Sequence, residues 1–247
     1  MNIKSYLDST YLKTAKQANI SKKENTVLVQ NFVQEAIDEK FKLVMVRPDK
    51  VVLAQKLIAA QNSKVLIGTV IGFPEGTNTI DEKLFEAKKA LKDGADELDF
   101  VVNFEVFKLG EFSLVKDEIL QGTQFALLHN KKVKWIIEIA ALNGAQIIQL
   151  TSLIKNVVVA NFKESEFENV FVKSSTGFYK TVDGLPNGAT FPAIIAMLEN
   201  AFPLPVKASG GIKTKEEALE MIKLGVKRIG TSSAKAISEG VETSDDY

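Results

Sequence analysis

Three charged residues lie inside apolar segments of the sequence, where charged side chains are seldom found. Lys173 follows Val-Phe-Val, Lys207 follows Pro-Val, and Asp99 is flanked by Leu and by Phe-Val-Val. Charged residues are rarely fully buried without a partner, so each one alone is equally well explained as an outward-facing or ion-paired structural residue. Two lysines at matching places in consecutive apolar segments favour a shared site instead.

Two lysines on adjacent strands would repel each other. Neighbouring strands lie about 4.8 Å apart. Two ammonium groups about 5 Å apart interact by about 3 kcal/mol at an effective dielectric of about 20, or roughly two pKa units, and burial adds to this effect. One of Lys173 and Lys207 is therefore predicted to be a neutral amine near pH 7. A neutral lysine attacks carbonyl carbon to form a Schiff base, the electron sink for breaking or forming carbon–carbon bonds. Asp99 is the candidate carboxylate for proton relay.

A second group of residues is suited to binding an anion. A Gly-Gly pair follows one β-rich segment, and a Gly-Thr-Ser-Ser sequence follows the next and opens a short predicted helix over 234–237. In a barrel of alternating strands and helices, the loops after the last two strands form a recurrent phosphate site. A turn or a helix cap explains either element alone, but both in this order favour phosphate. The candidate residues are Gly210, Gly211, Gly230, Ser232 and Ser233.

The composition excludes several other kinds of site. The chain has no cysteine and a single histidine, His129, which removes thiol nucleophiles, disulfides and His-rich metal sites. Its 31 Lys and Arg balance its 31 Asp and Glu, so neither a nucleic acid nor a membrane surface is an expected partner. No apolar run reaches the roughly 18 residues of a membrane span, and the first residues lack the apolar region of a secretory signal. A cytoplasmic protein without metal is expected.

The elements that must position these residues follow an alternating pattern. Short β-rich runs alternate with segments of helical period, as in repeated βαβ units over a parallel sheet. Two capping boxes, Ser21–Glu24 and Thr79–Glu82, predict helices that begin near residues 22 and 80. The strands are predicted over Ile3–Asp8, Leu43–Arg47, Lys64–Phe73, Glu97–Val102, Val133–Ile139, Val170–Ser174, Pro205–Ser209 and Arg228–Gly230.

Eight such pairs in 247 residues, with no linker to divide them, predict one α/β domain, a (β/α)8 TIM barrel over residues 1–239. The alternative is an open doubly wound sheet, but Asp-Ser-Thr follows the first strand in place of the glycine-rich turn typical of that fold. Residues 240–247 lack apolar period and are predicted to form a loose tail. Trp135 is predicted to pack in the core and His129 to lie at an exposed helix end, while Glu138 receives no role.

At these residues the sequence resembles the deoxyribose-phosphate aldolase family of class I, Schiff-base aldolases. The likeness extends from about Tyr6 to Ala236, nearly the whole chain. Each segment alone is modest, but the ordered set is specific. The matching segments are 6–13, 70–74, 94–99 with 101–103, 171–178, 207–214 and 228–233.

The resemblance implies a role for each candidate residue. Lys173 would be the Schiff-base lysine, Lys207 the lysine that depresses its pKa, and Asp99 the carboxylate of the proton relay. The glycines and serines named above would bind the 5-phosphate. The remaining substrate-binding candidates are Asp8, Thr10, Thr176 and Gly177.

The implied reaction is the reversible cleavage of 2-deoxy-D-ribose 5-phosphate to acetaldehyde and D-glyceraldehyde 3-phosphate. The partners implied are therefore a phosphorylated sugar and aldehydes, with no cofactor, and a homodimer is expected.

The sequence also departs from the family pattern. Many members carry a cysteine after the second strand, where this chain has Met45-Val46-Arg47, and Ser9 replaces the usual histidine between Asp8 and Thr10. The fifth strand ends in a less polar sequence than usual, and Tyr247 is a candidate for the terminal tyrosine that reaches the site in some members. Two alternatives stay open: another lysine-dependent lyase acting on a different sugar phosphate, and a barrel that binds a sugar phosphate without turning it over.

Overall fold

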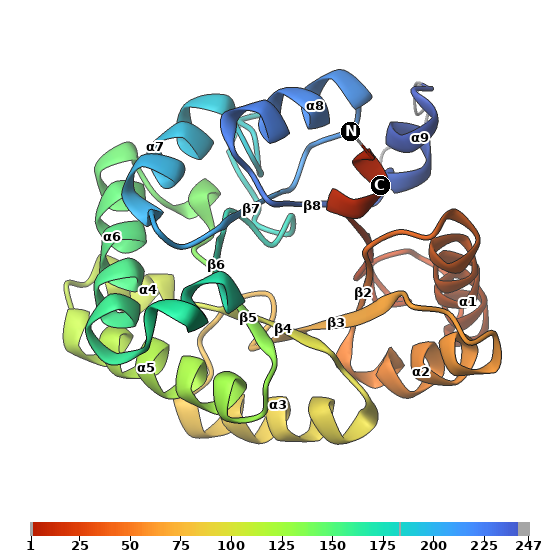
Figure 1. Ribbon diagram of the computed structural model, residues 1–247, viewed down its shortest axis with the longest axis horizontal. Coiled ribbons are helices and arrows are strands. Elements are labelled where there is room, and N and C mark those ends of the chain that lie inside the picture. Colours follow the sequence, from red (N-terminus) through yellow and green to blue (C-terminus); the bar gives the residue numbers. More distant parts are fainter. Residues whose placement is uncertain (1, 183, 242–247) are drawn as a thin grey trace.

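The computed structural model describes residues 2–182 and 184–241. Eight parallel strands pair in sequence order and close into a barrel when β8 pairs with β1 (Figure 1). The predicted (β/α)8 barrel is confirmed. Its strands are β1 (Leu7–Tyr11), β2 (Leu43–Val46), β3 (Leu66–Ile71), β4 (Glu97–Val101), β5 (Lys132–Ile136), β6 (Val170–Lys173), β7 (Val206–Ser209) and β8 (Arg228–Thr231).

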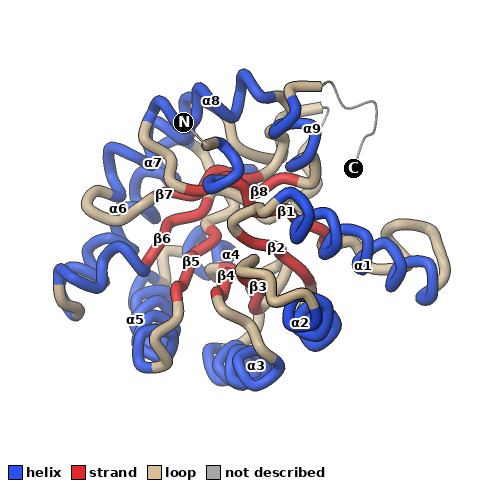
Figure 2. The backbone as a smooth tube through the Cα atoms, turned by 45° about the vertical axis from the view of Figure 1, so that its right-hand side comes forward, coloured by secondary structure: helices blue, strands red, loops and turns tan. Residues whose placement is uncertain are grey.

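Helices surround the barrel as an outer layer, with the strands inside (Figure 2). The α-helices are α1 (Lys22–Glu39), α2 (Val51–Ala60), α3 (Ile80–Asp93), α4 (Phe104–Lys108), α5 (Phe112–Leu128), α6 (Gly144–Asn161), α7 (Phe191–Ala201), α8 (Lys215–Leu224) and α9 (Ala234–Glu239). Short 3-10 helices are η1 (Ile3–Tyr6), η2 (Pro48–Lys50), η3 (Ile139–Ala141) and η4 (Glu164–Asn169).

Both predicted capping boxes are present. The Ser21 hydroxyl accepts a hydrogen bond from the amide of Glu24, and the Glu24 carboxylate accepts one from the amide of Ser21. Thr79 and Glu82 make the same exchange at the start of α3. The first amides of each helix, which have no partner within the helix, are thereby satisfied.

Three predicted strands, those at β1, β3 and β5, have boundaries that are wrong by two residues or more. The chain before Leu7 forms η1 in place of a strand, because the Asn2 side chain accepts a hydrogen bond from the amide of Lys4 and starts a helical turn. β3 ends before Gly72, whose φ of 64° is left-handed. β5 ends before Glu138, whose φ is 53°. An apolar run in the sequence does not reveal such changes in backbone direction.

Side chains alternate between the barrel interior and the helices. Those facing the helices, including Leu98, Phe100 and Trp135, belong to the main core. Trp135 is fully buried, as predicted, and its indole nitrogen donates to the Thr123 hydroxyl over 3.0 Å. His129 is exposed at the end of α5, also as predicted.

Inside the barrel, the β2 and β3 side is apolar. Leu43, Met45 and Val70 pack together there. Gly68 leaves room for them, because a Cβ at this position would lie 2.5 Å from Cε of Met45. The remaining strands line the interior with charged side chains, which form the site below.

The barrel ends with α9, and the left-handed Gly240 follows it. Tyr247 and most of the predicted tail, residues 242–247, lie outside the described residues. Within the described part of the chain, no helix is both long and apolar enough to cross a bilayer.

Candidate active site

The carboxylate of Asp99 on β4 joins three lysines inside the barrel. Its Oδ2 lies 2.9 Å from Nζ of Lys173 and 3.0 Å from Nζ of Lys207, while its Oδ1 lies 2.5 Å from Nζ of Lys134. Lys173 and Lys207 are paired Cα partners on β6 and β7. Since both contact the same oxygen, their nitrogens cannot be further apart than the sum of these two distances. The structure therefore brings together all three residues that the sequence singles out for catalysis.

A wider ionic network surrounds this cluster. Lys134 also lies 2.7 Å from Glu97, and Lys207 lies 2.6 Å from Asp8. Arg228 on β8 reaches both Asp8 and Glu97. The sequence did not identify Lys134, Glu97 and Arg228 as members of the site. For Glu97 a signal was available, because it lies two residues before Asp99 and residues two apart face the same side of a strand.

The network contains one more cation than carboxylates when every group is ionised. One proton can therefore leave without making the interior negative. The cations are Lys134, Lys173, Lys207 and Arg228, and the carboxylates are Asp8, Glu97 and Asp99.

The pKa values indicate which cation loses that proton. Burial lowers the pKa of Lys173 to about 8, with Lys207 acting in the same direction and Asp99 opposing it. Burial opposes ionisation of Asp99 as well, but Lys134, Lys173 and Lys207 hold its pKa well below the ordinary value. Burial would lower the pKa of Lys134, yet Asp99 and Glu97 raise it. Lys173 is thus able to supply a neutral amine close to neutral pH.

A cavity of about 320 Å³ opens above this network. Lys173 lines the cavity and keeps 3% of its surface exposed. Asp99 and Lys207 are fully buried, and neither is among the described residues that line the cavity. Lys173 is consequently the network lysine that a substrate can touch. The other lining residues that were predicted for substrate are Thr10, Thr176, Gly177, Gly210, Gly211, Gly230 and Ser232.

Two predicted substrate-binding residues lie elsewhere. Asp8 is fully buried beneath the cavity, where Arg228 and Lys207 hold its carboxylate, so the geometry assigns it to the ionic network. Ser233 precedes α9, and its amide donates to the Thr231 hydroxyl over 3.0 Å. Of the residues described, neither Asp8 nor Ser233 is among those lining the cavity.

The loops after β6 and β7 pack tightly at the cavity rim. A Cβ added to Gly188 would lie 2.3 Å from the carbonyl oxygen of Gly210, so only glycine allows this approach. The Ser174 hydroxyl donates to the carbonyl of Ser209 over 2.9 Å and accepts from the amide of Ser209 over the same distance. These contacts fix the backbone that carries Gly210 and Gly211, both of which have positive φ.

Glu138 supports the cavity wall from the end of β5. Its Oε2 accepts hydrogen bonds from the Thr176 amide, over 3.1 Å, and from the Thr176 hydroxyl. Burial raises the pKa of the Glu138 carboxyl, and the bonds from Thr176 oppose this. Glu138 thereby holds the turn in which Thr176 and Gly177 face the cavity.

The described residues contain no cluster of three or more His, Cys, Asp or Glu side chains able to hold a metal ion. The polar groups of the cavity instead suit an organic substrate with a carbonyl group and an anionic end. The lysine provides a nucleophile, and the rim provides backbone amides and hydroxyls.

Sequence and structure comparisons agree on one group of proteins. Residues 8–241 match the DeoC/LacD family aldolases. The chain is 38% identical over 246 residues to a deoxyribose-phosphate aldolase of Thermococcus gammatolerans, covering 99% of each chain. It is 36% identical over 248 residues to the deoxyribose-phosphate aldolase of Lactococcus lactis, covering 100% of each.

Solved structures show the same likeness. An aldolase called QR15 has a TM-score of 0.79 at 31% identity, with 97% of this chain and 95% of that chain covered. A tetrameric deoxyribose phosphate aldolase from Aeropyrum pernix has a TM-score of 0.76 at 29% identity, with 96% and 89% covered. With its barrel, its buried lysine cluster and this match over nearly its full length, the chain belongs to the DeoC/LacD aldolase family.

Proposed function

We propose that this protein is a deoxyribose-phosphate aldolase, which reversibly cleaves 2-deoxy-D-ribose 5-phosphate to acetaldehyde and D-glyceraldehyde 3-phosphate. The observation that carries the proposal is Lys173, a lysine with a pKa lowered to about 8 that lines a cavity and contacts a buried carboxylate. Full-length relatives that are named for this activity support the substrate.

The first step is attack by the neutral amine of Lys173 on the C1 aldehyde of the open-chain sugar. The carbinolamine takes up one proton from water, loses water and becomes a protonated Schiff base. This cation takes the position that the ammonium group of protonated Lys173 holds beside Asp99, so the network regains the charge that it has when every group is ionised. Asp99, 2.9 Å from the nitrogen, stabilises the cation.

The second step breaks the bond between C2 and C3. A base removes the proton of the C3 hydroxyl, the C2–C3 electrons move into the iminium, and C3 leaves as the aldehyde of D-glyceraldehyde 3-phosphate. C2 of the resulting enamine then takes up a proton, and water hydrolyses the Schiff base to release acetaldehyde. Asp99 and Lys207 form the proton relay next to the reacting nitrogen, with 3.0 Å between Oδ2 of Asp99 and Nζ of Lys207.

The glycine-rich rim binds the phosphate in this proposal. Gly210, Gly211 and Gly230 present backbone without side chains, and Ser232 adds a hydroxyl. Ser233 does not line the cavity among the described residues, and its amide donates to the Thr231 hydroxyl, so it is left out of the phosphate site in this proposal. Thr10 and Thr176 line the same cavity and bind the sugar hydroxyls.

Borohydride trapping with acetaldehyde tests the proposal directly. The expected result is a reduced ethyl adduct on Lys173, located by peptide mass mapping, that is absent from a Lys173→Leu variant. Release of D-glyceraldehyde 3-phosphate from 2-deoxy-D-ribose 5-phosphate is then followed in a coupled assay. An unmodified protein would favour a barrel that only binds sugar phosphates. An adduct on Lys173 without cleavage of this sugar would favour a lyase for another sugar phosphate.

Location and assembly are part of the same proposal. A chain without cysteine suits the cytoplasm, where disulfides do not persist. We propose a homodimer, which sedimentation equilibrium checks, whereas the relative from Aeropyrum pernix is described as tetrameric.

A further inference from the structure

Glu138 is a fully buried acidic residue that takes no part in the proposed reaction steps. It follows β5, and its φ of 53° lies in the left-handed region that residues other than glycine seldom adopt. The neighbouring backbone holds it there, because the amide of Ile139 donates to the carbonyl of Ser174 over 3.0 Å. Residues held in such strained conformations cluster at functional sites. Glu138 thereby reaches the turn after β6, where its carboxylate meets Thr176.

The hydroxyl of Thr176 has two of its three hydrogen-bonding positions occupied. A hydroxyl donates one hydrogen bond and accepts two. Thr176 donates its proton to Oε2 of Glu138, and the same oxygen accepts the Thr176 amide over 3.1 Å. The amide of Phe178 donates to the Thr176 hydroxyl over 3.0 Å. One acceptor position is left, and no group in the described part of the chain fills it, while Thr176 lines the catalytic cavity.

The direction of the hydrogen bond between Thr176 and Glu138 depends on the ionisation of the carboxyl group. An ionised carboxylate only accepts hydrogen bonds. Burial raises the pKa of Glu138, but the hydrogen bonds from Thr176 and the charge of Lys173 favour the ionised form. Because its proton is directed at this carboxylate, the Thr176 hydroxyl presents an acceptor to the cavity and not a donor.

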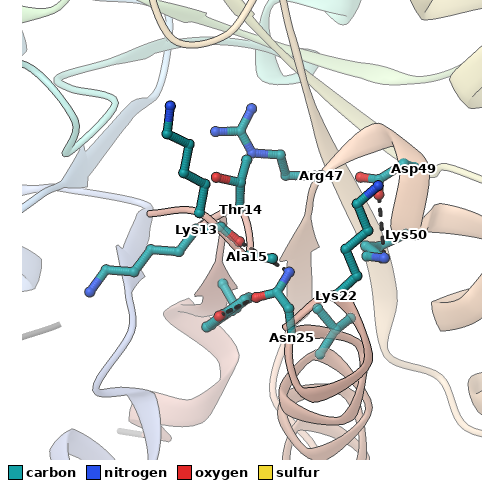
Figure 3. A pocket seen from close by; sticks show the side chains of 11 residues that line it. Lys13, Thr14, Ala15, Lys22, Asn25, Arg47, Asp49 and Lys50 are labelled. Carbon is teal, nitrogen blue, oxygen red and sulfur yellow. Dashed lines mark hydrogen bonds and ion pairs between the residues drawn. The ribbon is translucent and has the colours of Figure 1, made fainter. Parts of the chain in front are cut away.

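The other side of the turn is held by packing. The ring of Phe178 lies edge-on to that of Phe73, with 5.1 Å between the ring centres. The guanidinium of Arg47 lies 5.9 Å from the ring centre of Phe178. Arg47 follows β2 and lines a separate pocket beside α1 (Figure 3). This packing favours the position of the Phe178 amide, so the orientation of the Thr176 hydroxyl is set from both sides before a substrate arrives.

We propose that Glu138 is a positioning residue that fixes the Thr176 hydroxyl as a hydrogen-bond acceptor, so that the cavity selects substrates with a hydroxyl donor at this point. The inference rests on the proposed function, because it concerns the hydroxylated aldehyde that the aldolase releases or adds. In D-glyceraldehyde 3-phosphate this donor is the hydroxyl on C2, next to the reacting carbonyl. A site built for a substrate hydroxyl rejects an analogue that lacks it, because the polar group of the protein is then left unpaired.

Aldol addition of acetaldehyde to three acceptor aldehydes tests the direction of this hydrogen bond. The acceptors are D-glyceraldehyde 3-phosphate, 3-oxopropyl phosphate, in which hydrogen replaces the C2 hydroxyl, and 2-fluoro-3-oxopropyl phosphate, in which fluorine replaces it. The hydroxyl preference is kcat/KM for the first acceptor divided by that for the second. It should be at least about tenfold higher in the unmodified chain than in Thr176→Val.

The fluorinated acceptor distinguishes an accepting from a donating Thr176 hydroxyl, because fluorine is close to a hydroxyl in size but cannot donate. The fluorine preference is kcat/KM for this acceptor divided by that for 3-oxopropyl phosphate. It should be no higher in the unmodified chain than in Thr176→Val. Comparing the two proteins removes the intrinsic reactivity of each acceptor, which is the same in both.

Variants of Glu138 test whether it acts through Thr176. Glu138→Leu removes the acceptor and should lower the hydroxyl preference at least about fivefold, because the Thr176 hydroxyl loses its fixed orientation. Glu138→Gln keeps an acceptor oxygen and should stay within about twofold of the unmodified chain. In a Thr176→Val background, Glu138→Leu should cause no further change in the preference.

The matched control is Glu86→Leu. Glu86 also accepts a loop amide, that of Gly72, over 2.8 Å, but neither is among the described residues lining the catalytic cavity, so the hydroxyl preference should not change. An unchanged preference in Glu138→Leu, with all acceptors slowed equally, would show a purely structural role and overturn the proposal. A fluorine preference that is higher in the unmodified chain than in Thr176→Val would show that Thr176 donates, and it would overturn the proposal even where Glu138→Leu does not fold.

The same assay separates failure of this proposal from failure of the proposed function. Addition of acetaldehyde to the acceptors with an unmoved hydroxyl preference overturns the positioning role of Glu138 alone. The lack of addition to any acceptor by the unmodified chain overturns the aldolase function, and the positioning role with it.

Discussion

Three buried lysines contact Asp99, and their surroundings give them different properties. Lys134 lies between two carboxylates, Asp99 and Glu97, and its pKa is raised despite burial. Lys173 contacts Asp99 and faces the cavity, and its pKa is lowered to about 8 by burial with the help of Lys207. Lys134 is therefore a structural cation, and Lys173 is the candidate nucleophile, because they differ in their carboxylate contacts and in their exposure to the cavity.

Replacing Lys207 by methionine should raise the pKa of Lys173 above about 8. The substitution removes a like charge and leaves Asp99 with one cation fewer, so the ammonium form of Lys173 becomes more stable. Since only the neutral amine reacts, the acid limb of the pH profile of kcat/KM should move to higher pH. Loss of the relay should also reduce kcat by roughly 10²–10⁴.

The measurement is kcat/KM from pH 6 to 10 for the unmodified chain, Lys207→Met and Lys207→Arg. The arginine variant keeps the positive charge and should keep the acid limb in place even where its rate is lower. An unshifted limb in the methionine variant would show that Lys207 does not influence the ionisation of Lys173.

Lys173 should also lower the stability of the fold, because burial lowers its pKa in the folded protein from the ordinary lysine value of 10.5 to about 8. The folded state then binds its proton less tightly than the unfolded state does. The penalty is full below about pH 8, fades as the pH rises toward 10.5, and amounts to roughly 3 kcal/mol for this shift. Lys173→Met should abolish turnover and yet raise the free energy of unfolding at pH 7, with a smaller gain at pH 10.

Urea denaturation at the two pH values measures this effect. Lys134→Met is the matched comparison and should have the opposite sign, a loss of about 3–5 kcal/mol, because it removes the cation that pairs with two buried carboxylates. If Lys173→Met lowered the free energy of unfolding at both pH values, the prediction would be wrong, and Lys173 would stabilise the fold as an ion-paired cation.

At the scale of elements, the substrate rim depends on two loops that meet at glycines. The segment before α7 approaches the loop after β7, where the amide of Ala189 donates to the carbonyl of Gly210 over 2.9 Å. The loop before α7 also carries Asn187, which lines the catalytic cavity. The geometry of the rim is therefore set by two loops together.

Gly188→Ala should damage phosphate binding selectively. The added Cβ would lie 2.3 Å from the Gly210 carbonyl and must displace the loop that presents Gly210 and Gly211. We expect KM for the phosphorylated sugar to rise at least about tenfold. Borohydride trapping of acetaldehyde on Lys173, which needs no phosphate, should stay within about twofold.

Gly144→Ala provides the control, since a Cβ there meets nothing within 4 Å. It should leave both measurements unchanged. Equal loss of acetaldehyde trapping and of sugar cleavage in Gly188→Ala would show that the loop supports the lysine and not the phosphate.

At the scale of the whole molecule, the ionic network connects most strands of the barrel. Its members come from β1, β4, β5, β6, β7 and β8. The interior at β2 and β3 is apolar instead, with Leu43, Met45 and Val70. The network therefore joins all the strands from β4 round to β1, next to this apolar cluster on both sides, and its charge state affects the stability of the entire fold.

Acid should unfold the protein over a defined range of pH. Burial opposes ionisation of Glu97, but Lys134 and Arg228 lower its pKa from 4.5 to about 2. A lowered carboxyl pKa stabilises the fold above pH 4.5, and this contribution is lost as the pH falls from 4.5 to about 2. The loss from Glu97 alone is on the order of 3 kcal/mol.

Thermal melting from pH 7 to 2.5 measures it. The Tm of the unmodified chain should be level above about pH 5 and fall below it. Glu97→Gln should start from a lower Tm and decline less steeply, because one of the titrating carboxylates is gone. An equally steep fall of Tm in both proteins would show that groups other than Glu97 cause the acid sensitivity.

Local pattern alone was enough for the barrel, the two capped helices and the three catalytic candidates. Strands buried on both faces must be apolar, so Lys173, Lys207 and Asp99 stand out, and a capping box depends only on residues three apart. The resemblance to the aldolases rests on the same short segments.

Contacts between distant strands settled the remainder. Strand register decides which lysine beside Asp99 faces the cavity and places Asp8 beneath it. It also brings Lys134, Glu97 and Arg228 into the network. Register determines which side chains share a layer inside the barrel, and the ion-paired partners of the network lie between 35 and 220 positions apart in the sequence. No local pattern carries information over such separations, because the ionisation and the exposure of a buried lysine are set by neighbours that the closed barrel brings to it.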